Sequence, residues 1–160
     1  MYNIFRTNLS GRLVSWLVLA ALALLAFGVV NASADVIIDN GDTGTSYTGT
    51  WRVSGGLSPY GVDSLWARDG ATYTWGFDSQ PAGTYKVGMW WSEWASRATD
   101  IGVEVNHGVG TDTISINQYE NAGQWNSLGT YYLDTSGSVT ITAAYGSTAV
   151  SYTHLTLPTN

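Results

Sequence analysis

Tryptophan residues close to charged side chains are the part of this sequence best suited to chemistry. Trp90 and Trp94 stand beside Glu93 and Arg97 in WWSEWASR, and a second group of the same character surrounds Trp66. An aromatic ring can stack on the apolar C–H face of a sugar, while carboxylate and guanidinium groups bond its hydroxyl edges. We therefore expect a carbohydrate-binding site built from these candidates: Trp90, Trp94, Glu93, Arg97, Trp66, Arg68 and Asp69.

The alternation of side chains predicts which tryptophans face outward. In GTYKVGMWW (83–91), Trp91 falls on the same face as the apolar residues at period two, and Trp90 points the other way. We therefore expect Trp91 in the core and Trp90 on the surface. Trp94 follows the end of this strand, where a plug over the end of the fold is the alternative to a ligand contact.

Catalytic residues are not expected, and none is assigned. The sequence has no GxSxG elbow, HExxH zinc motif or phosphate-binding glycine loop. His107 falls in a predicted turn, where a solvated histidine is more common than a member of a catalytic triad. Acids that could pair for glycoside hydrolysis also fall in predicted turns, where Asp bonds the local backbone: Asp63, Asp69, Asp100 and Asp112.

Metal binding is considered at one cluster of acids. Asp35, Asp39 and Asp42 lie together in DVIIDNGD. Calcium takes about six to eight oxygen ligands, and this stretch supplies few at loop spacing. We favour a strand followed by an Asx-stabilised turn. The expectation is no metal site and no cofactor, with a structural calcium ion as the less favoured alternative.

Composition excludes several classes of protein. The 160 residues include 12 Asp+Glu against 6 Lys+Arg, for a net charge of −6, which does not suit binding to nucleic-acid phosphates. The absence of cysteine excludes disulfide scaffolds and thiol nucleophiles. A hydrophobic content of 44% excludes a disordered chain, and the length predicts one domain.

Residues 1–34 have the pattern of a secretory signal peptide. Arg6 and Arg12 precede an apolar run over 13–30, and Ala32-Ser33-Ala34 offers a small-residue cleavage site. The run is close to the ~18-residue minimum for a spanning helix, so a retained anchor is the alternative. We expect cleavage after residue 34, an extracellular bacterial location, and no membrane association afterwards.

Residues 150–160 break the pattern of the domain. VSYTHLTLPT (150–159) resembles the frame translation of a transposase adapter used in sequencing libraries. We therefore expect a metagenomic gene fragment, in which native sequence stops near Ala149 and residues 150–160 are a non-native tail.

Residues 35–149 read as an all-β domain. Short apolar-alternating runs are separated by Gly, Asn, Asp and Ser, and no stretch has helical periodicity. This pattern predicts an antiparallel β-sandwich of the jelly-roll type. The expected strands cover 36–39, 47–53, 71–77, 83–91, 101–105, 113–117, 127–133 and 138–145.

Four blocks in a fixed order resemble the golvesin C-terminal/xanthan lyase carbohydrate-binding-like domain family. They are VIIDNGDTGTSYTGTW (36–51), LWARDGATYTW (65–75), AGTYKVGMWWSEW (82–94) and GTDTISINQYENAGQWNSLGTYYL (110–133). The resemblance implies a β-sandwich accessory module of a secreted, often polysaccharide-acting or cell-surface protein. It also implies that Trp125, in GQWNSLG, belongs to the scaffold and lies in the core. The family pattern closes with a further strand where this sequence has its adapter-like tail. We therefore expect the sandwich to lack its last strand.

The observations together favour a non-catalytic secreted module that attaches a larger extracellular protein to polysaccharide. The expected partner is polysaccharide, with no nucleic acid and no membrane. Two alternatives stay open. One is an adhesion or spacer domain of a cell-surface protein with no ligand of its own, and the other is an accessory fragment of a polysaccharide-degrading enzyme.

Overall fold

The computed structural model describes residues 35–150 and 152–156, and all regular structure in this part is β-strand. The predicted signal peptide lies outside the described residues. Across the ranges that are described, no helix is long and apolar enough to cross a bilayer. The strands are β1 (Val36–Asp39), β2 (Thr45–Tyr47), β3 (Arg52–Val53), β4 (Leu65–Ala67), β5 (Thr72–Gly76), β6 (Gly83–Trp90), β7 (Ile101–His107), β8 (Gly110–Ile116), β9 (Asn126–Leu133), β10 (Ser138–Thr142), β11 (Thr148–Val150) and β12 (Tyr152–Thr156).

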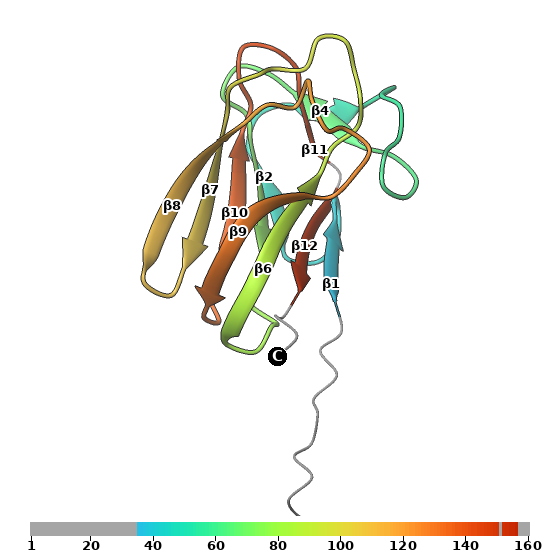
Figure 1. Cartoon of the computed structure of the whole chain (residues 1–160). Coiled ribbons are helices and arrows are strands. Elements are labelled where there is room, and N and C mark those ends of the chain that lie inside the picture. The colour runs from blue at the N-terminus through green and yellow to red at the C-terminus, as the bar shows by residue number, and fades with distance from the viewer. Residues whose placement is uncertain (1–34, 151, 157–160) are drawn as a thin grey trace, which may run out of the picture. The chain divides into compact units, whose positions relative to one another are not determined.

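Two antiparallel sheets face each other as a sandwich (Figure 1). One has the strand order β1-β12-β6-β9, and the other has the order β2-β5-β10-β7-β8. A small third sheet, β11-β4-β3, lies near the upper end of the sandwich as drawn in Figure 1. The predicted all-β class and antiparallel β-sandwich are confirmed.

The core lies between the two sheets because alternate residues of each strand point inward. Trp75 and Phe77 are fully buried with the inner faces of β7 and β10, and Trp91 is 3% exposed. The inward register predicted for 73–77 and 85–91 is therefore confirmed. The core cluster comprises Ile38, Tyr73, Trp75, Phe77, Tyr85, Val87, Met89, Trp91, Ile101, Val103, Val105, Leu128, Leu133, Val139 and Ile141.

A β-bulge bends the ladder between β6 and β9. Val87 pairs with Gly129 while Gly88 pairs with Ser127, so Leu128 is the extra residue. Gly129 has a φ of 143°, and a Cβ there would lie 2.7 Å from the ring of Tyr131. Only glycine fits this position of the bulge.

Strand boundaries differ from the prediction where strands are shortest. The stretch expected as one strand over 47–53 is divided between β2 and β3, which belong to different sheets. β4 and β11 were not predicted, because three residues are too few to show a period. The predicted Asp69-Gly70 turn is present, with φ of 58° and 80° at its two residues.

The structure places a strand, β12, in the stretch that was expected as a non-native tail, and the absence of the family's own last strand stays a prediction. β12 lies between β1 and β6 and pairs antiparallel with both. Its Tyr-Thr-His-Leu-Thr sequence is rich in β-forming residues, and the pairing covers edges that β1 and β6 would otherwise expose. The adapter origin of residues 150–160 stays a prediction.

Candidate functional site

Three segments far apart in the sequence meet at the end of the sandwich that carries the small sheet. Residues 54–57 follow β3, residues 92–97 follow β6, and Ser147 precedes β11. Leu57 N–H donates to the carbonyl oxygen of Glu93 at 3.0 Å, and Glu93 N–H donates back at 2.9 Å. A backbone bridge also joins the second segment to Ser147. These bonds fix the backbone from which the site is built.

Arg97 ties the three segments together through its side chain. The residue is 5% exposed, and its guanidinium donates to three serines. Nε bonds the Ser92 carbonyl oxygen at 3.0 Å, while Nη2 bonds Ser92 Oγ at 2.8 Å and Ser54 Oγ at 3.0 Å. Nη1 reaches Ser147 Oγ at 3.3 Å. The sequence suggested a polar partner at the surface, and the structure corrects this, because the segments close over the guanidinium.

The charge of Arg97 has no acidic partner in the part of the chain that the structure describes. Burial lowers the pKa of Arg97 to about 10, because desolvation disfavours the charged form. The side chain therefore remains cationic at neutral pH. It places a fixed positive charge in the wall of a pocket.

This pocket, which we call the end pocket, has a volume of about 130 Å³. It brings together four of the seven predicted residues, Trp66, Arg68, Trp94 and Arg97. Trp94 is 50% exposed, so much of its ring is free to meet a ligand. The complete lining is Ser54, Gly55, Trp66, Arg68, Trp94, Ser96, Arg97 and Ser147.

A second depression, the side hollow, adjoins the end pocket across Trp66 and Arg68. Arg52 on β3 stands directly opposite Trp66 on β4, and Arg68 follows two residues later on the same face. The guanidinium carbon of Arg68 lies 5.3 Å from the centre of the Trp66 ring, as a cation–π pair. Asp69, another predicted residue, also lines this hollow of about 480 Å³.

A third depression, the aromatic hollow, shares Trp94 with the end pocket. Leu57, Glu93 and Tyr119 line it, with a volume of about 530 Å³. Leu57 and Tyr119 are 66% and 63% exposed, an unusual degree for apolar side chains that stand together. Sequence reasoning missed both of them, as well as Arg52 and the serines around Arg97. Their positions depend on loops and on the two-residue strand β3, none of which leaves a local pattern in the sequence.

Trp90 faces outward as predicted, but it does not line the end pocket. Its Nε1–H donates to the Ser58 carbonyl oxygen at 3.0 Å. Its ring lies 5.2 Å from Tyr60 and 5.7 Å from Trp125, edge to face in both cases. The core position expected for Trp125 is wrong, because this ring covers Gly88 on the outer face of β6. The three rings anchor the loop that holds Ser58.

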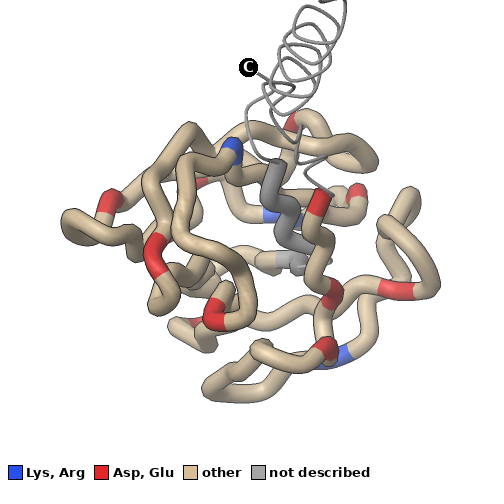
Figure 2. The backbone as a smooth tube through the Cα atoms, turned by 90° about the horizontal axis from the view of Figure 1, so that it is seen from below, with Lys and Arg blue, Asp and Glu red and all other residues tan. Residues whose placement is uncertain are grey.

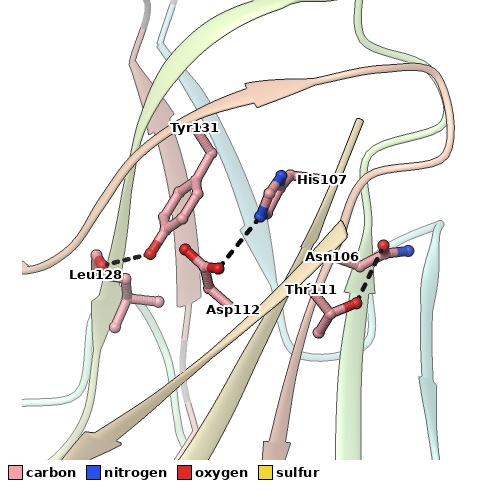
Figure 3. Close-up of polar contacts among 6 residues, drawn as sticks. All are labelled: Asn106, His107, Thr111, Asp112, Leu128 and Tyr131. Carbon is pink, nitrogen blue, oxygen red and sulfur yellow. Dashed lines mark hydrogen bonds and ion pairs between the residues drawn. The ribbon is translucent and has the colours of Figure 1, made fainter. Parts of the chain in front are cut away.

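His107 is less exposed than a turn histidine, because it is the last residue of β7 (Figure 3). Its side chain is 10% exposed, and Nε2 lies 3.6 Å from Oδ1 of Asp112, which stands on β8 instead of in a turn. Nε2 has no hydrogen-bond partner among the described residues, so no hydroxyl is placed there for proton transfer. Burial and then the charge of Asp112 raise the pKa of Tyr131, whose hydroxyl donates to the Leu128 carbonyl oxygen at 3.0 Å.

Two of the three clustered acids, Asp39 and Asp42, form a local turn at the end of β1. Asp42 Oδ2 accepts from the backbone N–H of Asp39 at 2.9 Å, and Asp39 Oδ1 accepts from that of Asn40 at 2.6 Å. Both bonds join a carboxylate to the local backbone, but neither reaches the N–H two residues on that defines the expected Asx turn. Within residues 35–150 and 152–156, no three His, Asp or Glu side chains gather as a metal site would require.

The model of the Golvesin C-terminal domain matches residues 36–152. The chain belongs to the Golvesin C-terminal domain family. This domain is 33% identical over 114 residues to a xanthan lyase of Bacillus sp. (strain GL1). The matched region covers 66% of this chain and 12% of that enzyme. The resemblance based on the four sequence blocks is confirmed. The chain thus spans only a small part of the relative's length.

Solved structures share the fold of this Golvesin C-terminal domain. Paenibacillus xanthan lyase has a TM-score of 0.72 at 31% identity, over 78% of this chain and 13% of that one. A family 35 carbohydrate binding module from Clostridium thermocellum has a TM-score of 0.55 at 14% identity, over 79% of this chain and 100% of that one. The second likeness concerns the fold alone. It extends over the full length of that module.

Proposed function

We propose that this domain is a non-catalytic carbohydrate-binding module that attaches a larger secreted protein to polysaccharide. The observation that carries the proposal is the end pocket, where a half-exposed indole stands beside guanidinium and hydroxyl groups. Such a set offers a stacking surface for the C–H face of a sugar and donors for its hydroxyl groups.

The stacking role is assigned to Trp94 rather than Trp90. Trp94 lies between the end pocket and the aromatic hollow, so a polymer could contact both depressions across its ring. Trp90 is packed edgewise against two other rings. Trp66 contributes less, because Arg68 covers one face of its indole. Arg68, Asp69 and Glu93 supply polar contacts around these rings.

Attachment to a larger protein is supported by the relatives. The matched region is 12% of the Bacillus xanthan lyase and 13% of the Paenibacillus enzyme, so the same fold occurs there as one part among others. Secretion is supported by the signal-peptide pattern of residues 1–34.

The proposal is tested by affinity electrophoresis of the chain in gels that contain neutral or acidic polysaccharides. One or more polymers should retard the folded wild-type chain, and Trp94→Ala should weaken that retardation. Base–aromatic stacking, a comparable contact, contributes about 1–3 kcal/mol, which corresponds to roughly a fivefold to hundredfold weaker binding. Tyr132→Ala is the matched control, because Tyr132 is 53% exposed on β9 and does not line the end pocket.

Unchanged mobility of the folded chain in every gel would contradict the binding function and support the adhesion or spacer alternative. Retardation that is lost in Trp90→Ala but kept in Trp94→Ala would show that the sugar stacks on Trp90 of β6 instead of on Trp94. Circular dichroism of each variant separates loss of binding from loss of folding.

A further inference from the structure

Basic residues gather at one place in an otherwise acidic molecule. All twelve Asp and Glu lie beyond residue 34, with only four of the six Lys and Arg. Figure 2 shows the acidic residues distributed around the backbone and few basic ones. Three of those four bases, Arg52, Arg68 and Arg97, line the end pocket or the side hollow. The fourth, Lys86, lies exposed on β6.

The end pocket itself contains positive charge and no negative charge. Arg68 and Arg97 are in its wall, and no Asp or Glu lines it. In the adjoining side hollow, Asp69 is the single acid against Arg52 and Arg68. Among the described ranges, no ion pair engages any of the three arginines. Arg68 is held over Trp66, so its guanidinium is already ordered before a ligand arrives.

Arg97 gives an independent reason to expect an anion. A buried charge is unfavourable unless it is paired as well as hydrogen-bonded. The partners of Arg97 are all neutral, since they are the hydroxyls of Ser54, Ser92 and Ser147 and one carbonyl oxygen. An anion in the end pocket would supply the counter-charge that the protein itself does not.

We infer that the end pocket recognises a carboxylate-bearing sugar, so that the ligand of this domain is an acidic polysaccharide. The inference rests on the proposed function, because it names the ligand class of the same site. A planar guanidinium matches a carboxylate through paired hydrogen bonds, and Arg68 is the exposed fork that can make them. Trp94 then stacks on the ring of the same or the next sugar.

The size of the end pocket agrees with one charged substituent at a time. Its volume of about 130 Å³ is smaller than the roughly 300–1,000 Å³ of sites that enclose a whole drug-sized ligand. The rest of the polymer would lie in the open side and aromatic hollows. Binding should therefore depend on the presence of the carboxylate more than on the length of the oligosaccharide.

The test compares acidic polymers with the same polymers after chemical reduction of each carboxylate to a hydroxymethyl group. Polygalacturonate, alginate and hyaluronate serve as probes, and equilibrium binding to the immobilised chain is measured. At least one acidic polymer should bind, and its reduced form should bind at least tenfold more weakly. Arg68→Gln should weaken binding of the acidic form by about tenfold, and Arg52→Gln by less. Lys86→Gln is the matched control and should bind as the wild type does.

Each contrary outcome has a separate meaning. Equal binding of an acidic polymer and its reduced form would overturn the inference while leaving carbohydrate binding intact. Binding of neutral polymers alone would do the same. An equal loss in Arg68→Gln and Lys86→Gln would show a general charge effect and would also overturn it. Failure of the folded chain to bind any polysaccharide would instead contradict the proposed function itself.

Discussion

Arg97 illustrates how one residue can serve two purposes at the end pocket. Its side chain joins three loop segments and also leaves a positive charge in the pocket wall. The sequence indicated a polar residue beside Trp94, but not its burial. The serines that enclose it lie 5, 43 and 50 residues away along the chain. A pattern read over a short window cannot contain such partners, whereas the tryptophans could be recognised from their type alone.

Asp134 provides a residue-level prediction about pH. Its Oδ1 accepts from the backbone N–H and the hydroxyl of Ser136, each at 2.8 Å, and these bonds lower the pKa of the carboxyl group below its ordinary value. Ser136→Ala keeps the backbone bond, which is the larger cause, and removes the hydroxyl. We therefore expect the pKa of Asp134 to return only part of the way, as measured by NMR titration of the carboxyl carbon. Thr135→Ala is the control and should leave the pKa unchanged.

The sign of the effect on stability follows from the direction of the shift. Because the carboxyl group of Asp134 has a lower pKa in the folded state than in the unfolded state, its contribution to stability is present above the unfolded value. That contribution is lost as the pH falls through the folded pKa. Ser136→Ala should therefore lower the free energy of unfolding at neutral pH. In strong acid, where Asp134 is protonated in both proteins, the variant and the wild type should differ less in this free energy. A pKa that does not move would show that the hydroxyl adds nothing.

Among the strands, those long enough to show a regular alternation of apolar and polar side chains could be predicted from the sequence. β6 and β9 carry eight residues each, and both were predicted within one residue at each end. β3, β4 and β11 have two or three residues each, too few to show a period. They form the sheet that holds Arg52 and Trp66, and Arg68 follows directly after β4. The candidate site thus depends on short strands that show no alternation in the sequence. The core is formed mainly by the longer strands, in which the alternation is clear.

The loop over 54–63 gives a prediction at the level of an element. Trp90 anchors it by donating to Ser58, while its ring packs on Tyr60 and Trp125. Trp90→Phe keeps an aromatic ring and removes the donor, so we expect a loss of about 0.5–1.5 kcal/mol in unfolding free energy. Hydrogen exchange within 54–63 should also become faster.

The control for this loop is Trp94→Phe. The indole of Trp94 makes no hydrogen bond to any described residue, and the side chain is half exposed. This substitution removes no hydrogen bond to the loop, so it should change the stability and the exchange rates of the loop less than the loss of the Ser58 bond does. If Trp90→Phe behaves in the same way, then the bond to Ser58 does not hold the loop.

At the scale of the whole molecule, the charge opposes the ligand that the end pocket favours. The chain has a net charge of −6, so an acidic polymer is repelled at long range while Arg52, Arg68 and Arg97 attract it at contact. The Debye length is about 30 Å at 0.01 M salt and about 10 Å at 0.1 M. At the lower salt concentration, charges throughout much of a small domain therefore act on the ligand. At the higher one, mainly the charges around the end pocket do.

Salt should therefore act in two opposite directions. From about 0.01 M to about 0.1 M salt, we expect the affinity for an acidic polymer to rise a few-fold, because the distant repulsion is screened first. Towards about 1 M, where the Debye length is only about 3 Å, the affinity should fall as the contacts with arginine are screened too. A reduced, uncharged polymer should show neither change, and Arg68→Gln should flatten the decline at high salt. An affinity that decreases steadily from the lowest salt concentration would mean that the net charge of the chain has no influence at the pocket. An affinity independent of salt would mean that charge plays no part in recognition of the polymer.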